Sequence, residues 1–184
     1  MWAHIEVWQS SEYEVSMSPG WNLISLPGTP IDSDLDSVLP DSMKASRVLQ
    51  WVDGAFEVNE RGSDGTWDSS GGVTELVAGS GYWIFTTAFE DIEALIPLPD
   101  PSNILPTVAV VGGWNLLGVI DLAQQDQGTS VGVPDVYLAS IEALVVYSYN
   151  TQANSWTRLD NAVTDMEVGS GYWVWANKAG TLVP

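Results

Sequence analysis

The chain has no cysteine and a single histidine, His4, among its 184 residues. Without cysteine, neither disulfide bonds nor thiol chemistry is available. One imidazole cannot build a zinc site from His and Cys ligands, or a Ser–His or Cys–His catalytic pair, within one chain. The sequence has no Walker loop or dinucleotide fingerprint, and no spacing singles out a pair of carboxylates. We therefore expect a protein that is not an enzyme and that needs no cofactor.

Basic residues are also scarce. Lys and Arg total 5 against 24 Asp and Glu, which gives a formal net charge of -19. A field of this sign repels phosphate backbones, so we expect no nucleic-acid binding. The scarcity of lysine beside many acids is also typical of proteins from high-salt organisms, where screening weakens self-repulsion.

Long apolar runs are missing as well. No apolar stretch is long enough to predict a spanning helix, so we expect no membrane partner. The first fifteen residues, MWAHIEVWQSSEYEV, contain no basic segment followed by an apolar run, and therefore predict no signal peptide.

The chain is rich in tryptophan, with ten, and 45% of its residues are apolar. Large aromatic side chains bury more apolar surface than any others, so they can stabilise small cores. The aromatic content therefore has a structural explanation before a functional one.

The pentapeptide GSGYW occurs twice, at Gly79–Trp83 and at Gly169–Trp173. Three further blocks match in the same order: SPGWNLISL with VGGWNLLGV, VLQWVDGAFEV with VVYSYNTQANSWTRL, and a closing ALIP with TLVP. Four matching blocks in one order indicate a tandem duplication. The segment PLPDPSNILP between the copies holds four prolines and is typical of a short, stiff connector. We therefore predict an N-terminal extension strand over 1–12, a first β module over 13–97, the connector over 98–106 and a second β module over 107–184.

The matching blocks are rich in β-branched and aromatic residues, as strands are. The sequence predicts a mainly β protein with two tandem β-sandwich-like or barrel-like modules, each with at most one short helix. Asp53-Gly54 predicts a tight hairpin turn. GSGYW predicts a turn followed by a central strand that is covered on both faces, because its apolar residues alternate to both sides, and a ligand platform is the alternative interpretation. The predicted module core comprises Trp21, Tyr82, Trp83, Trp114, Tyr172 and Trp173.

The segment around IDSDLDS predicts the helix of the first module. Ile31, Leu35, Val38 and Leu39 have helical spacing, with Asp32 or Ser33 as the N-cap and Pro40 as the end. A second short helix is expected near Val136 to Ala143. The alternating Asp32, Asp34 and Asp36 raise the question of a cation site, but the sequence fails the EF-hand pattern and we expect no metal site.

The first nine residues alternate in character. Trp2, His4, Glu6 and Trp8 would share one face of a strand, opposite Ala3, Ile5 and Val7. An exposed strand with two tryptophans invites aggregation unless it is paired. We therefore predict that this segment joins a sheet of its own chain or of a neighbour, with Trp2, Ile5, Val7 and Trp8 as a partner interface. Deleting residues 1–9 should lower the melting temperature or change the oligomeric state.

The first copy resembles a repeat found in archaeal and bacterial surface proteins and in large secreted or virion-associated proteins. The resemblance lies in the order of its parts: GWNLISLPGTP, a short acidic helix, a hairpin and LVAGSGYWIF. The resemblance covers nearly the whole chain from Val15 onward, although the second copy departs from it at GWNLLGVID. It implies a non-catalytic β-rich module for display or assembly, and it supplies no catalytic residues.

Because no signal peptide is predicted, the leading hypothesis is a structural virion protein of a tailed bacterial or archaeal virus. It would be exposed on the head, as a decoration-type protein, or on the tail, with other virion proteins and copies of itself as partners. The alternative is a cell-surface or glycan-binding β module in an extracellular or cell-surface location, because exposed aromatic faces can stack on sugars.

Overall fold

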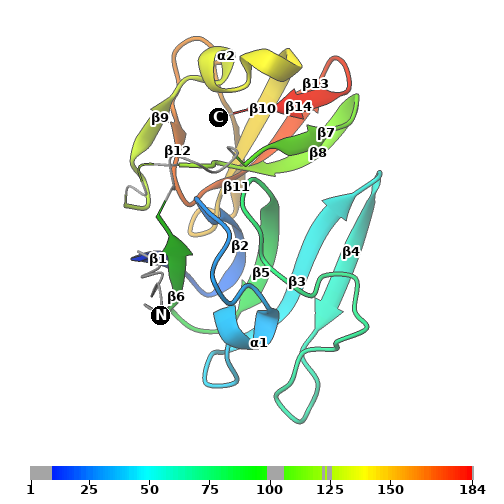
Figure 1. Cartoon of the computed structure of the whole chain (residues 1–184), viewed down its shortest axis with the longest axis vertical. Coiled ribbons are helices and arrows are strands. Elements are labelled where there is room, and N and C mark those ends of the chain that lie inside the picture. Colours follow the sequence, from blue (N-terminus) through cyan, green and yellow to red (C-terminus); the bar gives the residue numbers. More distant parts are fainter. Residues whose placement is uncertain (1–9, 99–105, 122, 124–125, 184) are drawn as a thin grey trace, which may run out of the picture.

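The computed structural model describes residues 10–98, 106–121, 123 and 126–183. The chain is mainly β, as predicted, with several antiparallel sheets and two short α-helices. We call residues 10–98 the first half and residues 106–183 the second half. The first half occupies the lower part of Figure 1 and the second half the upper part.

The first half contains one four-stranded sheet and one two-stranded sheet. The larger sheet has the order β2-β5-β3-β4, and β1 pairs with β6. The elements are β1 (Ser10–Met17), β2 (Gly20–Ser25), α1 (Leu35–Val38), β3 (Ala45–Val52), β4 (Ala55–Glu60), β5 (Gly81–Thr86) and β6 (Glu90–Pro97). Buried residues of β1 and β6, such as Val15 and Ile92, share a hydrophobic cluster with Ile84 of the larger sheet, which makes the half sandwich-like.

The second half repeats this arrangement. Its larger sheet has the order β8-β13-β10-β11, and β7 pairs with β14. The elements are β7 (Val108–Val110), β8 (Gly113–Gly118), β9 (Ser130–Gly132), α2 (Pro134–Tyr137), β10 (Ala143–Asn150), β11 (Ser155–Arg158), β12 (Met166–Glu167), β13 (Gly171–Ala176) and β14 (Gly180–Leu182). The short β9–β12 pair is added to this pattern, and a 3-10 turn (Ala139–Ile141) follows α2. By strand order β2 corresponds to β8, β5 to β13, β3 to β10 and β4 to β11.

The repeated GWN sequence closes a turn at the start of β2 and of β8. The glycines, Gly20 and Gly113, have φ of 109° and 107°, in the region that favours glycine. The side chain of Asn22 accepts a hydrogen bond from the backbone N–H of Ser18 at 3.0 Å and donates one to the Ser18 carbonyl at 2.8 Å. Asn115 makes the same two bonds to Val111, at 3.0 and 2.9 Å. Both asparagines are buried, so the motif satisfies backbone groups at these turns.

The tyrosine of GSGYW holds the loop that precedes each central strand. The Tyr82 hydroxyl accepts a hydrogen bond from the backbone N–H of Val77 at 2.9 Å, and the Tyr172 hydroxyl accepts one from Glu167 at 2.7 Å. Burial raises the pKa of each tyrosine to about 12, because the phenolate would lose its hydration.

The first glycine of GSGYW joins the two halves. The N–H of Ser25, at the end of β2, donates to the Gly169 carbonyl at 3.0 Å, and the N–H of Gly118, at the end of β8, donates to the Gly79 carbonyl at 2.9 Å. Because Ser25 corresponds to Gly118 and Gly79 to Gly169, this contact is reciprocal, as across a twofold axis. The main hydrophobic cluster runs through both halves without a break.

The first predicted helix is shorter than the sequence pattern indicated. It covers only Leu35–Val38, and its N-cap is Asp34, whose carboxylate accepts a hydrogen bond from Ser37 N–H at 2.9 Å. Neither Asp32 nor Ser33 is the cap, and Ile31 lies outside the helix and is exposed. The predicted Asp53-Gly54 turn is confirmed: both residues have positive φ, which suits the twist of a tight hairpin.

Candidate functional site

One face of each larger sheet carries rows of aromatic side chains. Residues paired directly across an antiparallel ladder point to the same face, so the register defines these rows. In the first half Trp21 pairs with Phe85, Leu23 with Trp83 and Trp51 with Phe56. In the second half Trp114 pairs with Trp175, Leu116 with Trp173 and Tyr149 with Trp156. The opposite faces, which bear Tyr82, Ile84, Tyr172 and Val174, belong to the main core.

The two aromatic faces meet where the halves join. Trp51 of the first half contacts Trp173 of the second with ring centroids 5.1 Å apart, and Trp83 contacts Tyr149 at 4.8 Å. The interplanar angles are 71° in both pairs, an edge-to-face arrangement that aromatic quadrupoles favour. Leu23, Trp83 and Leu116 form a small second core at this junction, with Trp51, Tyr149 and Trp173 packed against it.

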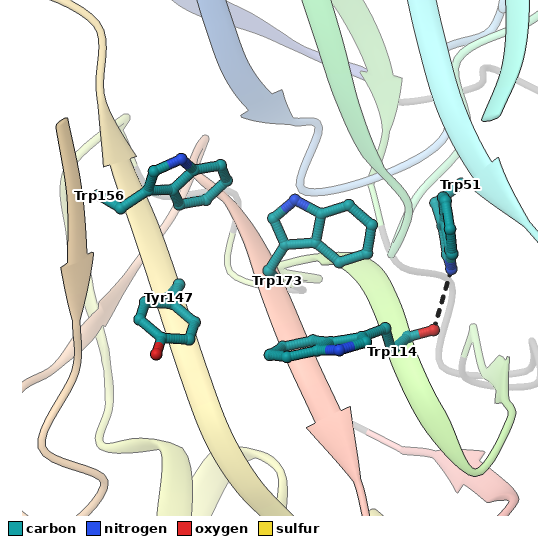
Figure 2. Close-up of a pocket in the computed structure, with 5 residues that line it drawn as sticks. All are labelled: Trp51, Trp114, Tyr147, Trp156 and Trp173. Atoms are coloured by element: carbon teal, nitrogen blue, oxygen red, sulfur yellow. Dashed lines mark hydrogen bonds between the residues drawn. The ribbon is translucent and has the colours of Figure 1, made fainter. Parts of the chain in front are cut away.

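A pocket of about 480 Å³ opens on the side of this cluster that belongs to the second half. All five lining residues are aromatic, as Figure 2 shows: Trp51, Trp114, Tyr147, Trp156 and Trp173. They come from β3, β8, β10, β11 and β13, so both halves contribute. The indole N–H of Trp51 donates to the Trp114 carbonyl at 3.0 Å, which fixes the one wall that crosses from the first half.

A second pocket of about 530 Å³ adjoins the first. Its lining includes the two tryptophans Trp156 and Trp173 that also line the first pocket. The other lining residues are Trp21, Leu49, Phe56, Trp83, Tyr149 and Asn154. Because the pockets share two walls, we describe them together as the aromatic groove.

The aromatic groove offers stacking faces and hydrogen-bond donors. Among the residues that the structure describes, no Asp, Glu, Lys, Arg or His lines either pocket. Within the part of the chain that the structure describes, the indole N–H groups of Trp114, Trp156 and Trp173 have no hydrogen-bond partner, whereas that of Trp51 has one. The groove can therefore stack on the apolar face of a ligand and donate hydrogen bonds to its oxygens.

The residues predicted as module core divide into two groups. Tyr82, Trp83 and Tyr172 are buried, as a core role requires. Trp21 and Trp173 are half-buried, and Trp114 is 37% exposed. The core prediction is wrong for Trp114, because this tryptophan lies on the sheet face that lines the aromatic groove rather than the main cluster. For the same reason, the strand of the second GSGYW is not covered on both faces, and Trp175 is exposed.

The remaining site predictions have separate outcomes. Trp2, Ile5, Val7 and Trp8 lie outside the described residues. Asp34 caps α1, and Asp36 accepts a hydrogen bond from the Trp67 backbone N–H at 3.3 Å. Among residues 10–98, 106–121, 123 and 126–183, no three His, Cys, Asp or Glu side chains are grouped so as to hold a metal ion.

Three of the five walls of the first pocket, Trp51, Tyr147 and Trp156, were not among the residues predicted from the sequence. Part of the pocket could have been found from the alternation of Tyr147 and Tyr149 on one strand, with Trp156 just after the following turn. This pattern predicts that Tyr147, Tyr149 and Trp156 share one face of a hairpin, but it does not predict whether that face is covered.

Comparisons with protein-family models, with curated proteins and with solved structures found no match for this chain. No helix in the described part of the chain has the length and apolar character needed to cross a bilayer. The function must therefore be argued from the aromatic groove itself.

Proposed function

We propose that this chain is a non-catalytic glycan-binding module whose aromatic groove holds an uncharged sugar chain. The observation that carries the proposal is the exposure of aromatic rings on an open sheet face, with Trp114 and Trp156 37% and 47% exposed. Exposed apolar patches of this kind usually mark a binding surface, since burying such rings would otherwise stabilise the fold. Each pocket also has the volume of a small-molecule site.

Charge narrows the class of ligand. A net charge of -19 repels polyanions such as nucleic acids and sulfated glycans, and it also opposes self-association through this face. An uncharged sugar avoids both penalties, because its C–H face stacks on aromatic rings while its hydroxyl oxygens accept hydrogen bonds from indole N–H groups.

The edge-to-face arrangement of the rings also bears on the ligand. Around the first pocket, Trp173 stands at 71° to Trp51 and at 87° to Trp114, whereas Trp114 and Tyr147 are tilted by 40°, so the rings form walls rather than one flat platform. Such walls enclose part of a flexible chain, whereas a coplanar row would suit a crystalline sugar surface.

The proposal is tested with cello-, manno-, xylo- and chito-oligosaccharides of one to six units, by titration calorimetry and tryptophan fluorescence. We expect binding to at least one series, weakened about tenfold or more by Trp156→Ala, because aromatic anchors contribute most of the affinity at such sites. Phe89→Ala is the control, since Phe89 is 78% exposed and does not line the groove. No binding in any series, or equal binding by the Trp156 variant, would contradict the proposal.

Location is a separate question from binding. From the sequence resemblance we propose the surface of a virus particle, with a cell-surface or extracellular position as the alternative. Mass spectrometry of purified particles tests this, and absence of the chain from them would remove the virion proposal without affecting the glycan-binding one.

A further inference from the structure

The register of the strands assigns each groove residue a counterpart in the other half. Trp21 and Trp114 occupy the same place in GWN, and Trp83 and Trp173 the same place in GYW. Leu49 pairs with Trp83 and Tyr147 pairs with Trp173, so Leu49 and Tyr147 are counterparts. Trp51 pairs with Phe56 and Tyr149 pairs with Trp156, so Trp51 is the counterpart of Tyr149 and Phe56 that of Trp156.

These correspondences relate the two pockets to each other. The first pocket is lined by Trp114, Tyr147, Trp156 and Trp173 of the second half. The second pocket is lined by their four counterparts in the first half, Trp21, Leu49, Phe56 and Trp83. Each pocket thus repeats the same four positions.

Each pocket also has walls from the opposite half. Trp51 of the first half lines the second-half pocket, and its counterpart Tyr149 lines the first-half pocket, together with Asn154, Trp156 and Trp173 of the second half. The exchange is reciprocal, as are the backbone bonds of Ser25 with Gly169 and of Gly118 with Gly79. An approximate twofold axis therefore relates the pockets, and neither is complete without the other half.

We propose that the aromatic groove contains two subsites, related by this approximate twofold axis, that bind two units of one sugar chain. This inference rests on the proposed function and adds the form of the ligand. Two similar sites that share the walls Trp156 and Trp173 suit a polymer with repeating units better than a single small molecule. Binding of the second unit is then intramolecular, so affinity rises steeply once the chain reaches both subsites.

The two subsites differ in their lining. Every wall of the second-half subsite is aromatic, whereas the first-half subsite also has the non-aromatic walls Leu49, in place of Tyr147, and Asn154. We infer that the second-half subsite binds more tightly and that the first-half subsite extends the contact.

The inference is tested by measuring affinity against chain length, in the oligosaccharide series that the wild-type protein binds. Trp114→Ala removes a wall of the second-half subsite only, and Phe56→Ala removes one of the first-half subsite only. Both side chains are exposed, so the fold should survive, and circular dichroism checks this. Phe89→Ala again serves as the control.

We expect wild-type affinity to increase about tenfold or more between the chain that fills one subsite and the chain that fills both. Phe56→Ala should remove this increase and leave binding of the shortest ligand unchanged. Trp114→Ala should weaken every length. If Phe56→Ala binds long chains as the wild type does, or if affinity is independent of length in the wild type, the two-subsite inference is overturned while glycan binding stands. If the wild type binds no member of the panel, the proposed function itself fails, and this inference with it.

Discussion

The backbone N–H of Gly118 donates a 2.9 Å hydrogen bond to the carbonyl oxygen of Gly79, directly across the junction of the two halves. The junction is tightly packed at this point. A Cβ atom on Gly118 would lie 2.4 Å from the Ser25 Cβ and 2.6 Å from the Ser80 carbonyl oxygen. Glycine is therefore required here by close approach between two backbones rather than by an unusual φ.

Gly118→Ala should lower the free energy of unfolding by about 2–4 kcal/mol, because the added methyl group overpacks the junction and strains a hydrogen bond. Urea unfolding followed by tryptophan fluorescence measures this. The matched control is Gly112→Ala, where the nearest atom would lie 3.6 Å from the new Cβ and the effect should be small. A similar stability for the two variants would show that the junction contributes little.

Asn22→Ala and Asn115→Ala should each destabilise the protein by about 1–3 kcal/mol, because each removes a buried amide and leaves partly buried backbone groups of a turn without their side-chain partners. Since one core runs through both halves, both variants should shift a single cooperative transition. Asn177→Ala is the control, because its side-chain bond to Glu142 is exposed and 3.4 Å long. Two separate transitions, each shifted by only one variant, would contradict the shared core.

The repeated turns and strands could be predicted from the sequence, whereas the exposed aromatic face could not. Repeated GWNL and GSGYW blocks predict repeated turns and strands, because such signals are local and depend on backbone conformation. The exposure of a ring does not depend on local sequence. Tyr82 and Trp114 both stand in alternating apolar strands, but only Tyr82 faces the main core. Which face is covered depends on how the halves pack, and no pattern within one strand carries that information.

Stability should fall steeply in strongly alkaline solution. Burial raises the pKa of Tyr82 and Tyr172 to about 12 in the folded protein, against an ordinary value of 10.0. Below pH 10 both tyrosines are neutral in the folded and unfolded chains, so they add no pH dependence. Between pH 10 and 12 only the unfolded chain ionises, and each tyrosine then removes up to roughly 3 kcal/mol of stability.

Urea unfolding at several alkaline pH values, with absorbance titration of the folded protein, measures this effect. Tyr82→Phe should show a shallower decline above pH 10 than the wild type, although it starts lower because Val77 N–H loses its acceptor. Equal slopes for the two proteins would contradict the assignment to Tyr82.

Trp67→Ala should destabilise the fold much more than Trp156→Ala, because Trp67 is buried in the core and Trp156 is a half-exposed wall of the aromatic groove. Trp67 is 6% exposed, its indole N–H donates to the Leu39 carbonyl at 3.0 Å, and the Arg61 guanidinium lies 4.6 Å from its ring centroid. Its replacement should cost about 3–5 kcal/mol, against about 1 kcal/mol for the half-exposed Trp156. Thermal unfolding of both variants measures this. If Trp156→Ala lowered the free energy of unfolding as much as Trp67→Ala does, the aromatic groove would be a structural feature rather than a binding one.

The reciprocal bonds between Ser25 and Gly169 and between Gly118 and Gly79 are those of a closed dimer. A polypeptide consisting of one half alone could satisfy the same bonds by pairing with an identical copy, and would then carry two identical pockets. Joining the copies in one chain removes that identity. Position 156 can be tryptophan while its counterpart is Phe56, and position 147 can be tyrosine while its counterpart is Leu49. Joining the two halves in one chain is therefore what allows one end of the groove to differ from the other, and under the proposed function this difference would distinguish the two directions of a sugar chain.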